Sequence, residues 1–93
     1  MSINDKHLED LYKVIASLST PSDCKMLFED LCTYKELEQM AQRIVAAKCL
    51  LNGNTYEEVI KKTDISSATL SRVSKCVKYG DGYKKFLSGK DNE

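Results

Sequence analysis

The stretch TYEEVIKKTDISSATLSRVSK, from Thr55 to Lys75, decides the fold of the 93-residue chain. It predicts a short helix, a tight turn around Asp64, and a second helix that Ser66 caps. Aspartate suits such a turn because it tolerates left-handed backbone better than most residues do. The apolar residues expected to pack these parts together are Val59, Ile60, Ile65, Leu70 and Val73. This pattern is typical of a helix-turn-helix motif, and the alternative is an ordinary helical hairpin with a serine-rich cap.

The outer face of the second helix carries the residue types that a helix needs to enter a DNA groove. Small hydroxyl and methyl side chains can approach base edges, and the cations that follow can bind phosphates. The N-terminal N–H groups of the helix also favour a phosphate. The candidate DNA-binding residues are Lys61, Lys62, Ser66, Ser67, Ala68, Thr69, Ser71, Arg72, Lys75 and Lys78. We expect the four lysines to bind phosphates and the small residues to lie near bases. Arg72 is expected to contact either a phosphate or a base.

Charge is distributed unevenly along the chain, although the formal net charge is zero. Residues 1–60 hold six Lys/Arg and ten Asp/Glu, a balance of −4. Residues 61–90 hold eight Lys/Arg and two Asp, a balance of +6, and the last three residues add −2. A basic C-terminal third indicates an end of the molecule that faces a polyanion, unless it is only a solvated helix face.

Helices are also expected on both sides of this motif. Thr20 can cap a helix that begins at Pro21, and Thr33 with Glu36 forms a capping box before the next one. Gly53 can take the positive φ that ends that helix. The expected helical ranges are about 4–19, 21–32, 34–51, 55–63, 66–79 and 83–88. The chain is therefore predicted to be all-α, with six helices.

The helices before the motif each carry a wide apolar stripe. A monomer of this length buries only about 65% of its unfolded surface, so a core made by one chain would be thin. If two chains shared the stripes, the short C-terminal helices would also be better anchored. The packing therefore favours a homodimer.

Several other kinds of protein are excluded by composition. Four cysteines lie at 24, 32, 49 and 76 without a CxxC motif, and His7 is the only histidine, so we expect no metal site and interpret the cysteines as small buried hydrophobes. The sequence has no Gly-rich phosphate loop and no nucleophile–base pattern, so neither an enzyme nor a cofactor is expected. It also lacks a run of about 18 apolar residues and a signal peptide, which predicts a cytoplasmic protein without a membrane partner.

The motifs LCTYKELEQMAQRIVAAKCLLNG, from Leu31, and TYEEVIKKTDISSATLSRVSK, from Thr55, support a family assignment. The span from Thr33 to about Leu87 resembles the tryptophan repressor superfamily, and within it the small repressor-like proteins of the YerC/YecD type. The resemblance implies a six-helix, intertwined homodimer whose two helix-turn-helix heads face successive major grooves, about 34 Å apart. It implies a single domain at 1–90, with dimerisation helices at 1–53, the helix-turn-helix at 54–79, a short C-terminal helix at 80–90 and a frayed tail at 91–93.

The resemblance also implies a ligand site. In the tryptophan repressor, two arginines hold a co-repressor between the third helix and the reading helix. Arg43 and Arg72 match these arginines, and Thr33 matches a threonine near that pocket. Val73 stands where the family has a small glycine and would intrude on an indole ring, and Cys76 stands in place of a serine. We therefore expect a small anionic co-regulator, carboxylate or phosphate, other than free tryptophan. Alternatively, Arg43 pairs with Glu38 or Gln39, and Arg72 contacts a DNA phosphate.

Two functional hypotheses follow. The first is a sequence-specific DNA-binding transcriptional regulator, a repressor that acts as a homodimer on double-stranded DNA. The second is a protein–protein interaction module with a helix-turn-helix shape and no DNA specificity. Glu57, which occupies a position that carries an arginine near DNA in the repressor, and the neighbouring Glu58 keep the second hypothesis open.

Overall fold

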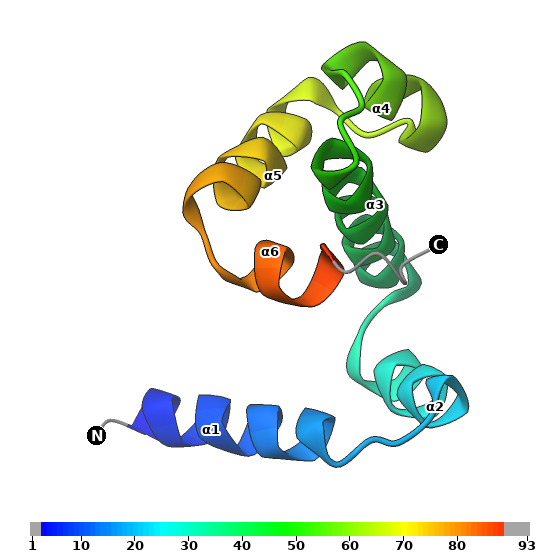
Figure 1. Ribbon diagram of the computed structural model, residues 1–93. Helices are drawn as coiled ribbons and strands as arrows, with labels where there is room; N and C mark the ends of the chain where they lie inside the picture. The colour runs from blue at the N-terminus through cyan, green and yellow to red at the C-terminus, as the bar shows by residue number, and fades with distance from the viewer. Residues whose placement is uncertain (1–2, 89–93) are drawn as a thin grey trace. The chain divides into compact units, whose positions relative to one another are not determined.

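A computed structural model describes residues 3–88, which form six α-helices and no strand (Figure 1). The helices are α1 (Ile3–Ala16), α2 (Pro21–Leu31), α3 (Tyr34–Leu51), α4 (Tyr56–Thr63), α5 (Ser67–Tyr79) and α6 (Gly82–Leu87). The expected frayed tail at 91–93 lies outside the described residues. The chain divides into two compact units, one ending at Leu37 and the other beginning at Glu38. The all-α prediction is confirmed over the described range.

The caps that start α2 and α3 are those predicted. The hydroxyl oxygen of Thr20 accepts the N–H of Asp23 at 3.0 Å, and Pro21 opens α2. At α3, the N–H of Thr33 donates to Glu36 Oε1 at 2.8 Å, and the N–H of Glu36 donates to Thr33 Oγ1 at 3.1 Å. Each pair satisfies backbone donors that a helix start would otherwise leave without a partner.

The end of α1 differs from the prediction, because the helix stops at Ala16 and does not reach residue 19. The N–H and the hydroxyl of Ser17 both donate to the carbonyl oxygen of Val14, at 3.1 and 2.6 Å. This tight turn replaces the next α-helical turn. Thr20 is extended (φ −134°, ψ 158°), as the residue before a proline prefers, so the chain must leave the helix earlier.

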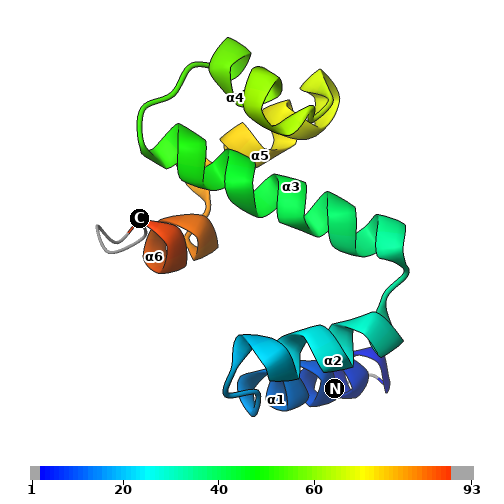
Figure 2. The same cartoon turned by 90° about the vertical axis from the view of Figure 1, so that its right-hand side faces the viewer.

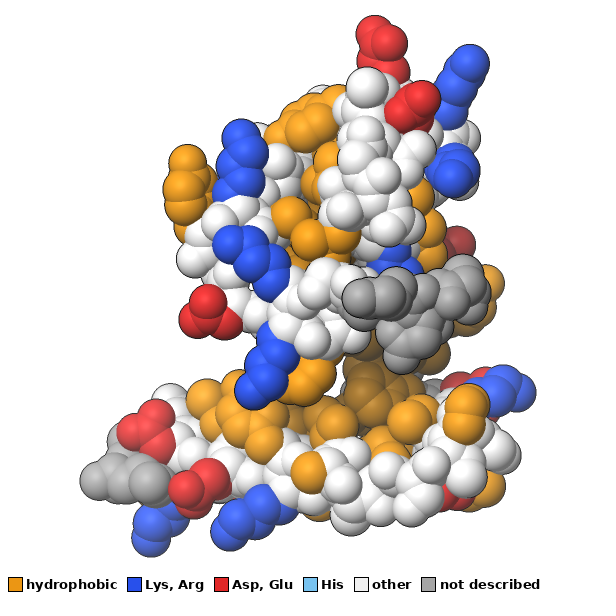
Figure 3. Space-filling view, viewed as in Figure 1, with side chains coloured by type: hydrophobic (Ala, Val, Ile, Leu, Met, Phe, Trp, Pro, Cys, Tyr) orange, Lys and Arg blue, Asp and Glu red, His pale blue; other side chains and the backbone are white. Residues whose placement is uncertain are grey.

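The N-terminal unit has little core of its own. No residue of α1 or α2 is buried. Large apolar side chains of these helices are instead exposed: Ile3, Leu8, Tyr12, Val14, Met26 and Leu31. Hydrophobic side chains are visible along these helices in Figure 3. Since burial of apolar surface is the main stabilising term in folding, this unit gains little from it in a single chain.

The C-terminal unit contains the buried core. The helices α4, α5 and α6 gather around the C-terminal part of α3 (Figure 2). The buried residues are Ala46, Ala47, Cys49, Val59, Ile65, Leu70 and Val73, and Leu50, Val77, Tyr83 and Leu87 pack against them. Alanines on α3 leave room for the larger side chains of α4 and α5. Gly53 ends the turn after α3 with φ 90°, as predicted.

Two predictions about burial are wrong. Only Cys49 of the four cysteines is buried, whereas Cys24 and Cys76 are exposed and Cys32 is half-buried. Ile60 is 36% exposed, while its neighbour Val59 is fully buried. Neighbouring helix positions point in different directions, so only one of the two can face the core.

Within residues 3–88, no helix combines the length and the apolar composition that crossing a membrane requires.

Candidate nucleic-acid interface

Local hydrogen bonds shape the helix-turn-helix. The predicted capping box starts α4: the N–H of Thr55 donates to Glu58 Oε1 at 2.8 Å, and the N–H of Glu58 donates to Thr55 Oγ1 at 3.2 Å. Asp64 ends α4 in the left-handed conformation (φ 60°, ψ 23°), and its N–H donates to the carbonyl of Ile60 at 2.8 Å. The sharp turn expected at Asp64 is therefore confirmed.

The buried side chains of α5 set the direction in which its outer face points. Leu70 and Val73 are fully or almost fully buried, and Ile65 of the turn is 3% exposed. The predicted cap is present, because Ser66 Oγ accepts the N–H of Thr69 at 3.2 Å. Its hydroxyl also lies 2.9 Å from Thr69 Oγ1, so these two hydroxyls partly satisfy each other. The side chains on the opposite face of α5 are consequently turned to solvent.

Most of the predicted DNA-binding residues lie on exposed surface. The exposed ones are Lys61, Lys62, Ser66, Ser67, Ala68, Ser71, Arg72, Lys75 and Lys78, whereas Thr69 is half-buried. The sequence of α5, SATLSRVSKCVKY, contains no acidic residue. Lys and Arg side chains lie over α5 and over α4 in Figure 3. The outer surface of α5 is thus polar and cationic.

An open hollow of about 490 Å³ lies between the start of α4 and α5. Its lining residues are Tyr56, Ala68, Ser71, Arg72, Ser74, Lys75, Lys78 and Tyr79. Five of the predicted residues are therefore brought together at one surface: Ala68, Ser71, Arg72, Lys75 and Lys78. Lys61 and Lys62 belong to the last turn of α4 and do not line this hollow.

Sequence reasoning missed both tyrosines of this hollow. Tyr56 is the first residue of α4, and Tyr79, which is 80% exposed, is the last of α5. The available signal was their position at the ends of the two predicted helices. Their phenolic hydroxyls add hydrogen-bonding groups at the edge of a cationic surface.

Two carboxylates lie in the first turn of α4. Glu58 is committed to the capping box, and the backbone N–H of Thr55 holds the pKa of Glu58 below its usual value. Glu57 is exposed, and its side chain makes no hydrogen bond or ion pair with another residue in the range 3–88. Glu57 is therefore the carboxylate of this turn that remains available to a partner.

Of the residues predicted to hold a small ligand, the two arginines do not line a common hollow. Thr33 belongs to the N-terminal unit, and its hydroxyl is used in the capping box of α3. Arg72 lines the hollow between α4 and α5, and Arg43 on α3 is half-buried and does not line it. The alternative pairing of Arg43 with Glu38 or Gln39 is also absent, since no hydrogen bond or ion pair joins the side chain of Arg43 to either residue.

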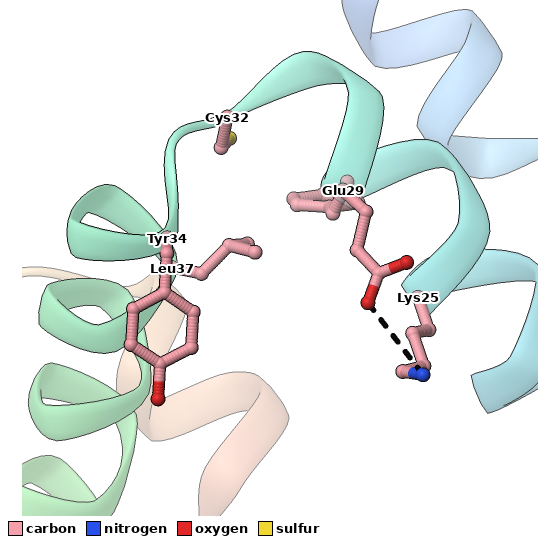
Figure 4. A pocket seen from close by; sticks show the side chains of 6 residues that line it. Lys25, Glu29, Cys32, Tyr34 and Leu37 are labelled. Carbon is pink, nitrogen blue, oxygen red and sulfur yellow. Dashed lines mark ion pairs between the residues drawn. The ribbon is translucent and has the colours of Figure 1, made fainter.

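Two further hollows are mainly apolar. One, of about 480 Å³, is lined by Ile44, Cys76, Gly80, Gly82, Tyr83, Phe86 and Leu87. The other, of about 370 Å³, lies in the N-terminal unit, where Tyr34 and Leu37 of α3 line it and the Leu37 side chain points towards α2 (Figure 4). Lys25 and Glu29, whose ion pair measures 3.5 Å, line its opposite side.

Among the described residues, no group of His, Cys, Asp and Glu side chains could hold a metal ion.

The fold and this surface define the class: an all-helical protein with a helix-turn-helix whose second helix presents a cationic, hydroxyl-rich face. Comparison with known families then identifies the chain, since the Trp repressor protein family matches residues 6–91. The protein belongs to the Trp repressor family, and the resemblance deduced from its motifs is confirmed.

Individual relatives agree with this assignment. The chain is 41% identical over 86 residues to the uncharacterized protein YerC of Bacillus subtilis (strain 168), covering 91% of this chain and 83% of that protein. Its fold matches the crystal structure of a candidate Trp repressor from Staphylococcus aureus, with a TM-score of 0.88, 31% identity, and coverage of 100% of this chain and 97% of the other. It also matches a TrpR-like protein from Eubacterium eligens ATCC 27750, with a TM-score of 0.82, 37% identity, and coverage of 86% and 84%.

Proposed function

We propose that the protein is a sequence-specific DNA-binding transcriptional regulator, a repressor that reads double-stranded DNA through α5. The observation that carries this proposal is the outer face of α5, which is cationic, free of acidic residues and turned to solvent by the buried Leu70 and Val73. A helix of this kind can enter the major groove because its small side chains let it approach base edges closely. Membership of the Trp repressor family supports the same function.

The residues divide into two groups by their chemistry. Ser67, Ala68 and Ser71 supply hydroxyl and methyl groups for base edges, and Thr69 contributes its methyl group because its hydroxyl faces Ser66. The cations Lys61, Lys62, Arg72, Lys75 and Lys78 bind phosphates of the backbone. Tyr56, at the edge of the same hollow, donates its phenolic hydroxyl to a phosphate next to those that Arg72 and Lys75 hold.

We further propose that the protein acts as a homodimer. The exposed apolar side chains of α1 and α2, neither of which has a buried residue, favour burial against a second copy. The apolar hollow around Phe86, a residue that is 74% exposed, adds a second surface of this kind. In a two-fold dimer, the same patches are buried twice, and each copy supplies one α5 to the DNA.

We also propose that Arg43 and Arg72 bind a small anionic co-regulator: they do not line a common hollow within one chain, but neither guanidinium is paired with another residue in the range 3–88. Free tryptophan is not the ligand that we propose, since Val73 fills its position with a buried side chain. A thermal-shift panel of carboxylates and phosphates, with tryptophan included, tests this idea. Stabilisation that is lost in Arg43→Ala would support it, and the absence of any shift would refute it.

The alternative function is a protein-interaction module. The exposed and unpaired Glu57 favours it, because a carboxylate beside the reading surface repels phosphates. The decisive experiment is selection of duplexes from a random pool at low and moderate salt. An enriched palindrome with half-sites about one helical turn apart would support the dimeric regulator. Failure to retain any duplex at low salt would refute DNA binding and favour the interaction module.

A further inference from the structure

We propose that Gln42 of α3 is a positioning residue that sets the orientation of the reading helix α5, an inference that rests on the DNA-reading function proposed above. The side-chain amide of Gln42 is partly buried, and its Nε2 donates to the backbone carbonyl oxygen of Thr63 at 3.1 Å. Within residues 3–88, this is the only hydrogen bond that joins α3 to the helix-turn-helix segment 55–79.

The carbonyl that Gln42 binds lies at a point where the backbone needs an outside partner. Thr63 is the last residue of α4, so its carbonyl has no N–H to accept from within the helix. The hydroxyl of Thr63 cannot help, because it donates to the carbonyl of Val59 at 2.8 Å and accepts the N–H of Ile65 at 3.2 Å. Gln42 thus completes the hydrogen bonding of the residue that precedes the left-handed Asp64.

The position of Gln42 on α3 explains why one hydrogen bond can affect the orientation of the helix-turn-helix. Gln42, Ala46 and Cys49 are spaced i, i+4 and i+7, so they share one face of the helix. Ala46 is fully buried and Cys49 is 8% exposed in the core that holds α4 and α5. Contacts of small apolar side chains are not directional, whereas a hydrogen bond constrains both distance and angle. The Gln42 bond therefore determines the angle at which the turn sits on α3.

This angle matters because two reading helices must act together. In a dimer, the α5 helices have to meet major grooves about 34 Å apart, so a small tilt of each helix moves its base-facing end out of register. Contacts with phosphates, made by flexible lysines, tolerate such a tilt better than contacts with base edges do. Loss of the Gln42 bond should accordingly lower discrimination between duplexes more than it lowers overall DNA affinity.

The test uses two variants at Gln42 and the same two changes at Gln39, an exposed residue of α3 whose side chain makes no hydrogen bond to residues 3–88. Gln42→Met keeps the size of the side chain and removes the donor. Gln42→Arg keeps a donor, because Nε–H of arginine follows the same number of carbons as Nε2 of glutamine. Gln39→Met and Gln39→Arg control for the added methionine and the added charge.

Two quantities are measured for each variant. One is amide hydrogen exchange of Asp64 and Ile65 in the free protein, and the other is the ratio of affinities for the selected duplex and a scrambled duplex of equal length. Gln42→Met should speed the exchange about tenfold and reduce the affinity ratio about tenfold, the effect of losing one partly buried hydrogen bond. Gln42→Arg should restore the exchange rate, and both Gln39 variants should exchange as the wild type does.

The outcomes separate this inference from the proposed function. If the wild type binds the selected duplex and Gln42→Met changes neither the exchange nor the affinity ratio, the positioning role is refuted and the proposed DNA-reading function is not. An equal loss of affinity for both duplexes would also overturn it. If the wild type discriminates between no duplexes even though Gln42→Met speeds the exchange, DNA reading itself is refuted, and the role assigned to Gln42 falls with it.

Discussion

The salt dependence of DNA binding should reveal Lys75 as a phosphate contact. Lys75 is exposed on α5 and lines the same hollow as Arg72 and Lys78. The logarithm of affinity falls with the logarithm of salt by about 0.9 for each phosphate neutralised. Since the proposed homodimer carries two copies, Lys75→Ala should make the slope less steep by about 1.8. Between about 50 and 200 mM salt, this changes the ratio of wild-type to variant affinity about 12-fold.

The assay is fluorescence anisotropy with a labelled copy of the selected duplex at a series of salt concentrations. The fold of the variant should be intact, because Lys75 is exposed and alanine favours helix. Lys35→Ala is the matched control: Lys35 is an exposed lysine in the first turn of α3, and it should leave the slope unchanged. The reasoning is refuted if Lys75→Ala leaves the slope unchanged, or if Lys35→Ala changes it as much.

Changes at four other positions test the fold and the oligomeric state. Leu70→Ala removes a fully buried side chain and should lower the free energy of unfolding by about 2–5 kcal/mol, measured in urea; a smaller loss would contradict its place in the core. Asp64→Val places a β-branched residue at φ 60° and should lower Tm, whereas Asp64→Gly should not; equal melting of the two would contradict the left-handed turn. The lowered pKa of Glu58 means that the charged carboxylate stabilises the fold above the ordinary value of 4.5 and that this stability is lost as pH falls through the folded-state pKa. Glu58→Gln should therefore lower Tm at neutral pH and match the wild type in acid, and identical pH profiles would refute the capping role. Tyr12→Glu on the exposed face of α1 should shift sedimentation towards monomer, and an unchanged oligomeric state would argue against that face as the dimer surface.

Local structure was predictable from the sequence because short-range chemistry determines it. The caps at Thr20, Thr33, Thr55 and Ser66 each depend on residues within three positions, and all four form as expected. The outer face of α5 was predictable for a similar reason, since the periodic burial of its apolar residues leaves only one face for the others. The left-handed turn at Asp64 follows from residue type and position together.

Features that depend on the third dimension were not predictable in this way. The exposure of Cys24 and Cys76 could not be deduced from residue type, because cysteine is usually buried. Tyr56 reaches the hollow beside α5 only because the turn folds α4 back against that helix. The bond from Gln42 to Thr63 spans 21 residues, and no spacing rule connects a mid-helix glutamine to a carbonyl so far along the chain.

The uneven distribution of the core has a consequence for how such a protein works. Every buried residue within the range 3–88 belongs to the C-terminal unit, so the core of the helix-turn-helix is formed within a single chain. No residue of α1 or α2 is fully buried in a single chain, so much of the stability of these helices has to come from another surface. If that surface is a second copy, dimerisation orders the N-terminal helices and doubles the number of reading helices in one step. A regulator built in this way would bind DNA tightly only above the concentration at which it dimerises. Its helix-turn-helix would stay folded both above and below that concentration.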